Sequence, residues 1–115
     1  MIHVGLAYNN LTNATLAVLV RNFPNLFCAD LQFNHVCDLN SALVQVSKLA
    51  DLKMLYLAGN PLTLSYRYRE IVKQNLIDLR FLDGTPAFTE AEENLKKKLR
   101  KKFVKQQQHN PGLVF

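Results

Sequence analysis

The sequence predicts an α/β solenoid, a right-handed coil of strand, turn and helix units with a short parallel sheet on its concave face. The first observation is a pattern of the form Leu-x-x-Leu-x-Leu-x-x-Asn-x-Leu, which occurs three times with its asparagines at Asn9, Asn34 and Asn60. These asparagines are 25 and 26 residues apart, and a period of about 20 to 50 residues is typical of repeat architectures. The second observation is a change of hydrophobic period inside each unit, from that of a strand to that of a helix.

Each copy of the pattern predicts a strand with one buried face. Apolar residues stand at its fourth and sixth places with a variable residue between them, as in Leu55, Tyr56 and Leu57, and this alternation is the period of a strand. A crossover of about a dozen residues or more lets each strand return parallel to the one before it. The residues expected on the buried helix stripes are Leu16, Leu19, Val20 and Phe23 in the first unit and Leu39, Leu43 and Val46 in the second.

The asparagine that follows each strand has a structural interpretation. It stands where the chain turns inward, and a side-chain amide at that point can hydrogen-bond the backbone of its own turn and of the neighbouring turn. We therefore expect Asn9, Asn34 and Asn60 to form a ladder of structural hydrogen bonds rather than to contact a ligand.

The end of the repeats resembles the leucine-rich-repeat cap, the C-terminal seal of short leucine-rich repeat proteins found among splicing factors, dynein light chains and axonemal proteins. The resemblance rests on Leu-Tyr-Leu-Ala-Gly-Asn-Pro at 55–61, on Tyr68-Arg69 and on Leu82-Asp83-Gly84. The chain departs from it at Ile77, where many members have proline. A terminal repeat must shield the core from water, so Tyr68 is expected to lie on the last coil with its hydroxyl bonded, and Arg69 to pair with an acid such as Asp83.

A wider resemblance covers about residues 1–84. The motifs Gly-Leu-Ala-Tyr-Asn-Asn-Leu at 5–11, Phe-Pro-Asn-Leu at 23–26 and Leu-Ala-Gly-Asn-Pro-Leu at 57–62 resemble the C-terminal repeats of a cilium-associated family, that of leucine-rich repeat-containing protein 43. This resemblance implies a scaffold in a ciliary, axonemal or other cytoskeletal assembly.

Composition argues against an enzyme and against a membrane protein. The longest apolar run, Leu16 to Val20, is far shorter than the ~20 residues of a membrane span, and no signal peptide is recognisable. Cys28 and Cys37 lack metal-binding spacing, so reduced thiols and a cytoplasmic location are expected. His3 and Cys28 could neighbour each other across strands, but a zinc site needs about four ligands and these are only two. The sequence contains no phosphate-binding loop and no nucleophile paired with a base. We expect no cofactor and no metal.

The chain divides by charge. Residues 1–88, the repeats and their cap, contain seven basic and six acidic side chains, whereas residues 89–115 contain seven basic and three acidic ones. Thr89 and Glu92 form an N-cap signature for a basic amphipathic helix over 89–108, and residues 109–115 are expected to be disordered. The cations on its polar faces include Lys97, Lys98, Lys101, Lys102 and Lys105.

Two functions are therefore weighed. The first is a protein partner bound on the concave face, where interface-forming aromatic and methionine side chains gather around Phe33, Met54 and Tyr56. Phe81 could instead be covered by the basic helix. The second is an acidic surface, such as tubulin tails or RNA, bound by that helix. Runs of charge are often only solvated helix faces. RNA is disfavoured because the helix has a single aromatic, Phe103, on which bases could stack. The concave residues proposed to contact the partner are Tyr8, Asp30, Gln32, Phe33, Met54, Tyr56 and Phe81.

The first strand is expected to present an unpaired edge and an apolar end. An exposed strand edge invites association, so we expect a partner, or repeats upstream, to cover it.

Overall fold

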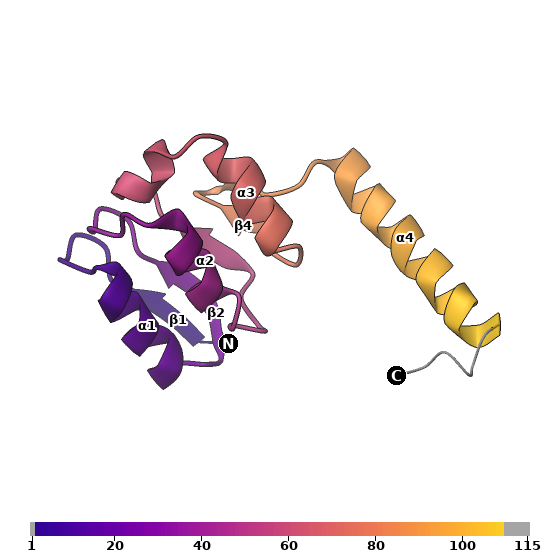
Figure 1. Ribbon diagram of the computed structural model, residues 1–115, viewed down its shortest axis with the longest axis horizontal. Coiled ribbons are helices and arrows are strands. Elements are labelled where there is room, and N and C mark those ends of the chain that lie inside the picture. The colour runs from indigo at the N-terminus through magenta and orange to yellow at the C-terminus, as the bar shows by residue number, and fades with distance from the viewer. Residues whose placement is uncertain (1, 110–115) are drawn as a thin grey trace.

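A single five-stranded sheet and the helices on one of its faces form the body of the molecule (Figure 1). This computed structural model describes residues 2–109, and the side chains of residues 2–102. The strands lie in chain order, and the first four are parallel while the last is antiparallel. Their bounds are β1 Ile2–Gly5, β2 Leu26–Asp30, β3 Met54–Tyr56, β4 Phe81–Leu82 and β5 Thr85–Pro86.

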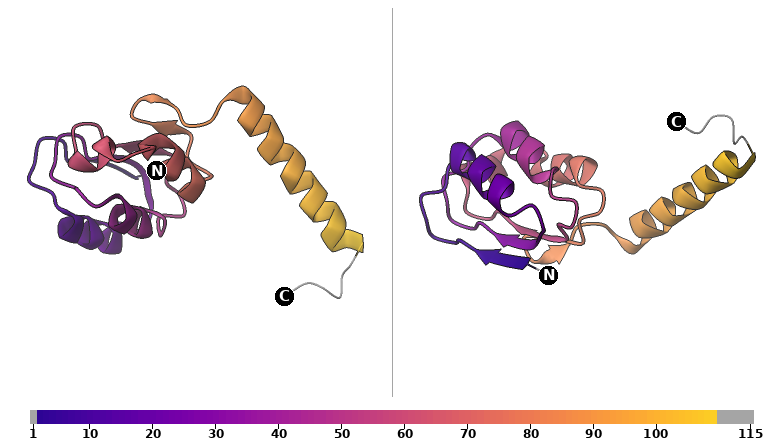
Figure 2. Two further views of the ribbon diagram at one scale, coloured as in Figure 1. Left: turned by 45° about the horizontal axis from the view of Figure 1, so that its top comes forward. Right: turned by 90° about the horizontal axis from the view of Figure 1, so that it is seen from below.

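The helices of the repeats cover one face of the sheet and leave the other face uncovered (Figure 2). The last helix instead projects away from the sheet (Figures 1 and 2). The predicted α/β coil is thus confirmed. The helices are α1 Asn13–Asn22, α2 Leu39–Val46, the 3-10 helix η1 Pro61–Leu64, α3 Tyr68–Asn75 and α4 Glu90–His109.

The core lies between the sheet and α1 to α3. Leu55 and Leu57, at the fourth and sixth places of the third copy, are fully buried, and burial of one leucine side chain contributes about 1.5–3 kcal/mol. Two helices begin at capping side chains, because the Thr12 hydroxyl accepts from the amide of Thr15 and the Asp38 carboxylate accepts from that of Ser41. All the residues expected on the helix stripes are buried except Phe23, which is 44% exposed. The α-helix ends before it, since its φ is −129°.

Hydrogen bonds from asparagine side chains join successive coils. Asn60 is 2% exposed; its Oδ1 accepts from the amide of Val36, and its Nδ2 donates to the carbonyls of Leu31 and Leu57. Asn34 bonds its own turn and the preceding turn in the same way. Asn9 is exposed, and its side-chain amide donates only within its own turn. The ladder therefore ends at the first coil.

The cap differs from the expected pairing. The Tyr68 hydroxyl donates to Asp83 Oδ2 at 2.8 Å, while Asp83 Oδ1 accepts from the amides of Leu57 and Ala58. Arg69 does not pair with this acid, as expected from the sequence, but donates to the Leu82 carbonyl at 3.0 Å. Asp83 is already occupied by three donors, so the guanidinium bonds backbone and hydroxyl oxygens of the β4–β5 hairpin.

At Gly84, with a φ of +83°, the chain turns into the antiparallel β5, whose Pro86 pairs with Phe81. Two expectations about the last helix need correction. Phe81 is not covered by α4, because that helix projects away and leaves the ring 39% exposed. The helix expected over 89–108 spans Glu90–His109, so His109 is helical; the rest of the predicted tail lies outside the described residues.

Candidate interaction surfaces

The uncovered face of the sheet presents two rows of side chains. The parallel register aligns Cys28 with Met54 and Met54 with Phe81, and it aligns Asp30 with Tyr56. We call this surface, together with His3 in β1, the open sheet face. Its methionine and tyrosine are half-buried among their neighbours, so they are held in position while one side of each remains accessible.

The polar part of the open sheet face is preorganised. Both the backbone amide and the side-chain amide of Gln32 donate to Asp30 Oδ1, at 3.2 and 3.0 Å, so the carboxylate has a fixed orientation. Burial, and after it the charge of Asp30, raises the pKa of the Cys28 thiol above its ordinary value. The thiol therefore stays protonated at neutral pH, and a protonated thiol is a poor nucleophile and metal ligand.

Three predicted contact residues, Tyr8, Gln32 and Phe33, lie beyond the ends of the strands. Gln32 is bonded back to Asp30, whereas the two aromatic residues are not on the sheet. The strands end at the fifth place of each copy, and both aromatics follow in turns with φ values of +59° and +55°. Such values are unusual for bulky side chains. The structure therefore divides the predicted site into the open sheet face and a separate group in the turns.

The turn group is an aromatic stack. The rings of Tyr8 and Phe33 are 4.7 Å apart and nearly parallel, at 11°, which is a favourable stacked geometry. The ring of Phe33 also lies against Gly59, where a Cβ would stand 2.3 Å from Cδ1 of that ring. We call Tyr8, Phe33 and Gly59 the turn stack; it requires glycine in the third coil.

An open groove of about 570 Å³ adjoins the turn stack. Its lining includes Phe33, His35, Pro61 and Leu64 and contains no carboxylate or cationic lysine or arginine side chain. Leu64 is 89% exposed, and nothing in its spacing singled it out from the buried leucines around it. Sequence reasoning missed this residue because it ends the short η1, Pro61–Leu64, a segment that has neither strand nor α-helix period.

The cations of α4 form a second candidate surface. Lys97, Lys98, Lys101 and Lys102 are exposed, and among the described side chains none of them forms an ion pair. The side chain of Lys105, predicted to belong to this group, lies outside the described residues.

The described residues contain neither a candidate metal-binding cluster nor a helix that could span a membrane. No cluster of three His, Cys, Asp or Glu side chains that could hold a metal ion occurs among the described residues. None of the helices described is long and apolar enough to cross a membrane.

Comparison with solved structures identifies the fold. The Mex67 LRR domain from Chaetomium thermophilum is 30% identical to this chain and superposes with a TM-score of 0.67, and the match covers 78% of this chain and 60% of that chain. This chain has the leucine-rich repeat fold. A chain in a structure of Chaetomium Mex67:Mtr2 subunits is similar to this one at 28% identity and a TM-score of 0.65, with 78% of this chain and 58% of that chain covered.

The sequence of the leucine-rich repeat domain is also similar to curated proteins. Leucine-rich repeat-containing protein 43 is 39% identical to it over 83 residues in both Homo sapiens and Mus musculus. The matched region covers 70% of this chain but spans only 13% of the human protein and 12% of the mouse protein. This finding confirms the resemblance of the repeats to that protein. No family model matches the chain.

Proposed function

We propose that this leucine-rich repeat domain is a non-enzymatic protein-interaction module whose partner binds on the open sheet face. The observation that carries the proposal is an uncovered sheet surface on which Met54 is aligned with Phe81 of the next strand, and Tyr56 stands two residues further along the strand of Met54. Methionine and aromatic side chains are enriched in protein interfaces. The Asp30 carboxylate, held by Gln32, gives the same surface a fixed polar point.

Two properties of similar proteins support a protein partner. One similar chain belongs to a structure of two protein subunits, Chaetomium Mex67:Mtr2. The resemblance to the cilium-associated family of leucine-rich repeat-containing protein 43 leads us to place the partner in a ciliary, axonemal or other cytoskeletal assembly, with the domain in the cytoplasm or cilium.

Comparative proximity labelling in ciliated cells tests this function. Met54→Ala with Tyr56→Ala removes two side chains of the open sheet face, and Val18→Ala with Val44→Ala removes two exposed apolar side chains, 47% and 58% exposed, from the helices on the opposite side. We expect the first variant to lose its labelled axonemal partners and the second to retain them, with both still folded by circular dichroism. Equal labelling by the wild type and the first variant would contradict the proposal.

A second candidate function is the binding of an acidic surface by α4. It is favoured by the four exposed lysines without ion pairs described above and by the projection of α4 from the repeats (Figure 1). Tubulin tails and RNA are acidic surfaces of this kind. Replacing Lys97, Lys98, Lys101 and Lys102 by glutamine should abolish such binding, and binding to the wild type should weaken steeply between low salt and ~150 mM salt, because surface charges are screened.

The outer edge of β1 supports a third, structural part of the proposal. Among the described residues this strand pairs only with β2, and Ile2 is 42% exposed. We propose that a partner or a further repeat covers the edge, which hydrogen exchange would detect as protection of the β1 amides in the assembled state.

A further inference from the structure

We propose that α4 docks against an acidic amphipathic helix of a protein partner, through a leucine stripe formed by Leu95 and Leu99. This inference rests on the second candidate function, the binding of an acidic surface by α4, and it specifies the chemistry of that surface. The partner must carry apolar residues in a row as well as carboxylates.

The leucine stripe is exposed in the free domain. Leu95 and Leu99 are 57% and 58% exposed. They stand four residues apart, so they are neighbours on one face of the helix. Helical residues with this spacing form the apolar anchors when one helix binds another or enters a groove.

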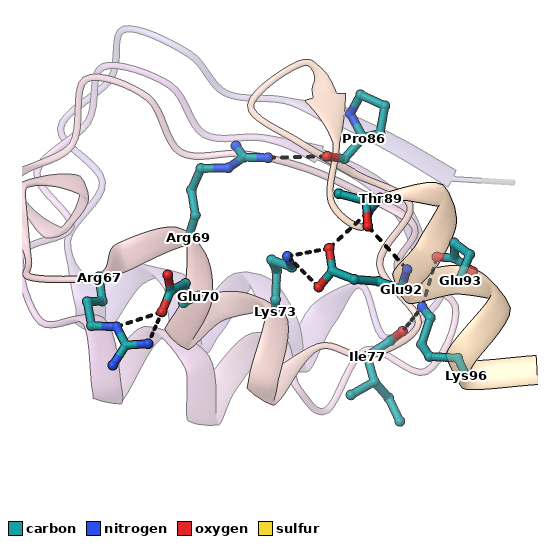
Figure 3. Close-up of polar contacts among 10 residues, drawn as sticks. All are labelled: Arg67, Arg69, Glu70, Lys73, Ile77, Pro86, Thr89, Glu92, Glu93 and Lys96. Atoms are coloured by element: carbon teal, nitrogen blue, oxygen red, sulfur yellow. Dashed lines mark hydrogen bonds and ion pairs between the residues drawn. The ribbon is translucent and has the colours of Figure 1, made fainter. Parts of the chain in front are cut away.

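The body of the domain holds α4 by a different face. Glu92, Lys96 and Arg100 recur at intervals of four residues. Glu92 and Lys96 contact Lys73 and Ile77 of the body (Figure 3). Arg100 donates to Asp78. We call these three residues the clamp face. Because Leu95 and Leu99 each precede a clamp residue by one position, they are rotated from it by about 100°. The intramolecular contacts therefore leave the stripe free.

Most contacts of the clamp face are polar and fix the direction of α4. Lys73 Nζ donates to both carboxylate oxygens of Glu92, at 3.0 and 2.9 Å, and Lys96 Nζ donates to the Ile77 carbonyl at 2.8 Å (Figure 3). Lys96 Nζ also lies 3.7 Å from the centre of the Phe88 ring, a cation–π contact. An interface helix held in one direction loses less entropy when it binds.

The charges beside the stripe specify an acidic partner. Lys98 and Lys102 follow Leu95 and Leu99 by three residues and therefore lie next to them on the helix surface. Neither lysine forms an ion pair among the described side chains. A second copy of α4 would bring cations against cations, so self-association through this face is opposed. Carboxylates on the partner, placed beside its own apolar row, would meet these lysines.

The same residues favour a helix over other acidic surfaces. A flexible acidic tail or a nucleic-acid backbone offers no apolar row to cover two leucines. A lipid surface takes up helices whose apolar face is wide, whereas lysines directly flank this stripe. A helix with a narrow apolar seam and acidic flanks matches both features, as in charged helix pairs.

Binding of synthetic probes to the full chain tests the inference. The probe is a labelled acidic amphipathic peptide with leucines in a helical row and glutamates beside them. Its controls are a scrambled peptide of the same composition, a polyglutamate peptide and anionic vesicles of phosphatidylserine and phosphatidylcholine. Fluorescence anisotropy at ~150 mM salt reports the Kd of each peptide, and co-sedimentation reports vesicle binding.

We expect the amphipathic peptide to bind about 10- to 100-fold more tightly than the scrambled one, since binding buries the exposed half of two leucine side chains. Leu95→Gln with Leu99→Gln should remove this difference, while Leu64→Gln, which changes a leucine that is 89% exposed outside α4, should retain it. Circular dichroism checks that the α4 variant keeps its helix.

Each other outcome overturns a defined part of the reasoning. Equal binding of amphipathic, scrambled and polyglutamate peptides, unchanged by the leucine substitutions, would refute the helix partner and leave the acidic-surface function intact. Failure of every acidic peptide to bind would refute both. Vesicle binding that depends on Leu95 and Leu99, without binding of the amphipathic peptide, would refute the helix partner in favour of a lipid surface.

Discussion

Replacing Asn60 by alanine should destabilise the domain strongly. Among the three repeat asparagines, we expect Asn34→Ala to have a comparable effect and Asn9→Ala a much smaller one. Asn60 is 2% exposed, and its side chain satisfies the amide of Val36 and the carbonyls of Leu31 and Leu57 with bonds of 3.1, 2.8 and 2.9 Å. Alanine leaves the amide of Val36 without a partner and too deep for easy access by water. The carbonyls of Leu31 and Leu57 each lose one of two donors, because they still accept from Asn34 Nδ2 and from the backbone amide of residue 60.

The size of the effect follows from one unpaired amide and two lost hydrogen bonds. A buried polar group that loses its partner costs about 1–3 kcal/mol, and a lost hydrogen bond costs about 0.5–1.5 kcal/mol. Partial relaxation and entry of water reduce the sum, so we expect a loss of about 2–4 kcal/mol. Since a domain of this size has a total stability of about 5–15 kcal/mol, the variant should lose a large share of its free energy of unfolding.

The first coil contains the matched control. Asn9 stands at the equivalent place of the repeat, but it is exposed and its side chain donates only to Leu6 and Ala7 of its own turn. Asn9→Ala should therefore cost about 1 kcal/mol or less. Urea denaturation followed by circular dichroism at 222 nm measures both free energies of unfolding. Equal losses for the two variants would refute the reasoning that buried backbone groups, and not the asparagine itself, set the cost.

Three further predictions concern single residues. Gly59→Ala should cost about 1–3 kcal/mol in urea denaturation, because it has a φ of +78° and its new Cβ would meet an aromatic ring at 2.3 Å, whereas Gly5, with nothing within 4 Å, should tolerate alanine within about 1 kcal/mol. Burial and a carboxylate partner raise the pKa of the Tyr68 phenol above its ordinary value of 10.0. The contribution of this phenol to stability is complete below that pH and is lost as the pH rises further. Thermal unfolding should therefore show that the stability of Tyr68→Phe depends less on pH above 10 than that of the wild type. The backbone amide of Thr89, and after it Lys73, lower the pKa of Glu92 from 4.5 to about 2. The contribution of this carboxylate to stability is present above pH 4.5 and is lost as the pH falls toward 2. NMR titration should find a higher pKa for Glu92 in Lys73→Met, and an unchanged pKa would contradict this account.

The repeat pattern was sufficient to predict the sheet and most of the core. Leu55 and Leu57 were expected inward from their alternation, and both are buried. Phe23 fitted the helical stripe of the first unit equally well, yet it is exposed. Periodicity reports which face a residue would occupy if the helix continued, but the end of a helix depends on local backbone geometry.

The candidate sites were less accessible to sequence reasoning. The alignment of Met54 with Phe81 followed from stacking the copies, because register in a repeat array is set by the repeat itself. The separation of Tyr8 and Phe33 from the open sheet face did not, since it depends on the positive φ values of these two residues in the turns after the strands. The partner of Asp83 was also misassigned: charge favoured Arg69, but the distance from the phenol of Tyr68 decided it.

The sequence by itself determined the coil, its parallel register, the asparagines that join its turns and the basic character of the last helix, because each of these depends on local spacing and residue type. Only the tertiary structure decided which asparagine is buried, where the aromatic side chains gather and which face of α4 is left open. Those properties depend on which groups meet across coils, and whether α4 folds back or projects is settled by a few contacts such as that between Lys73 and Glu92.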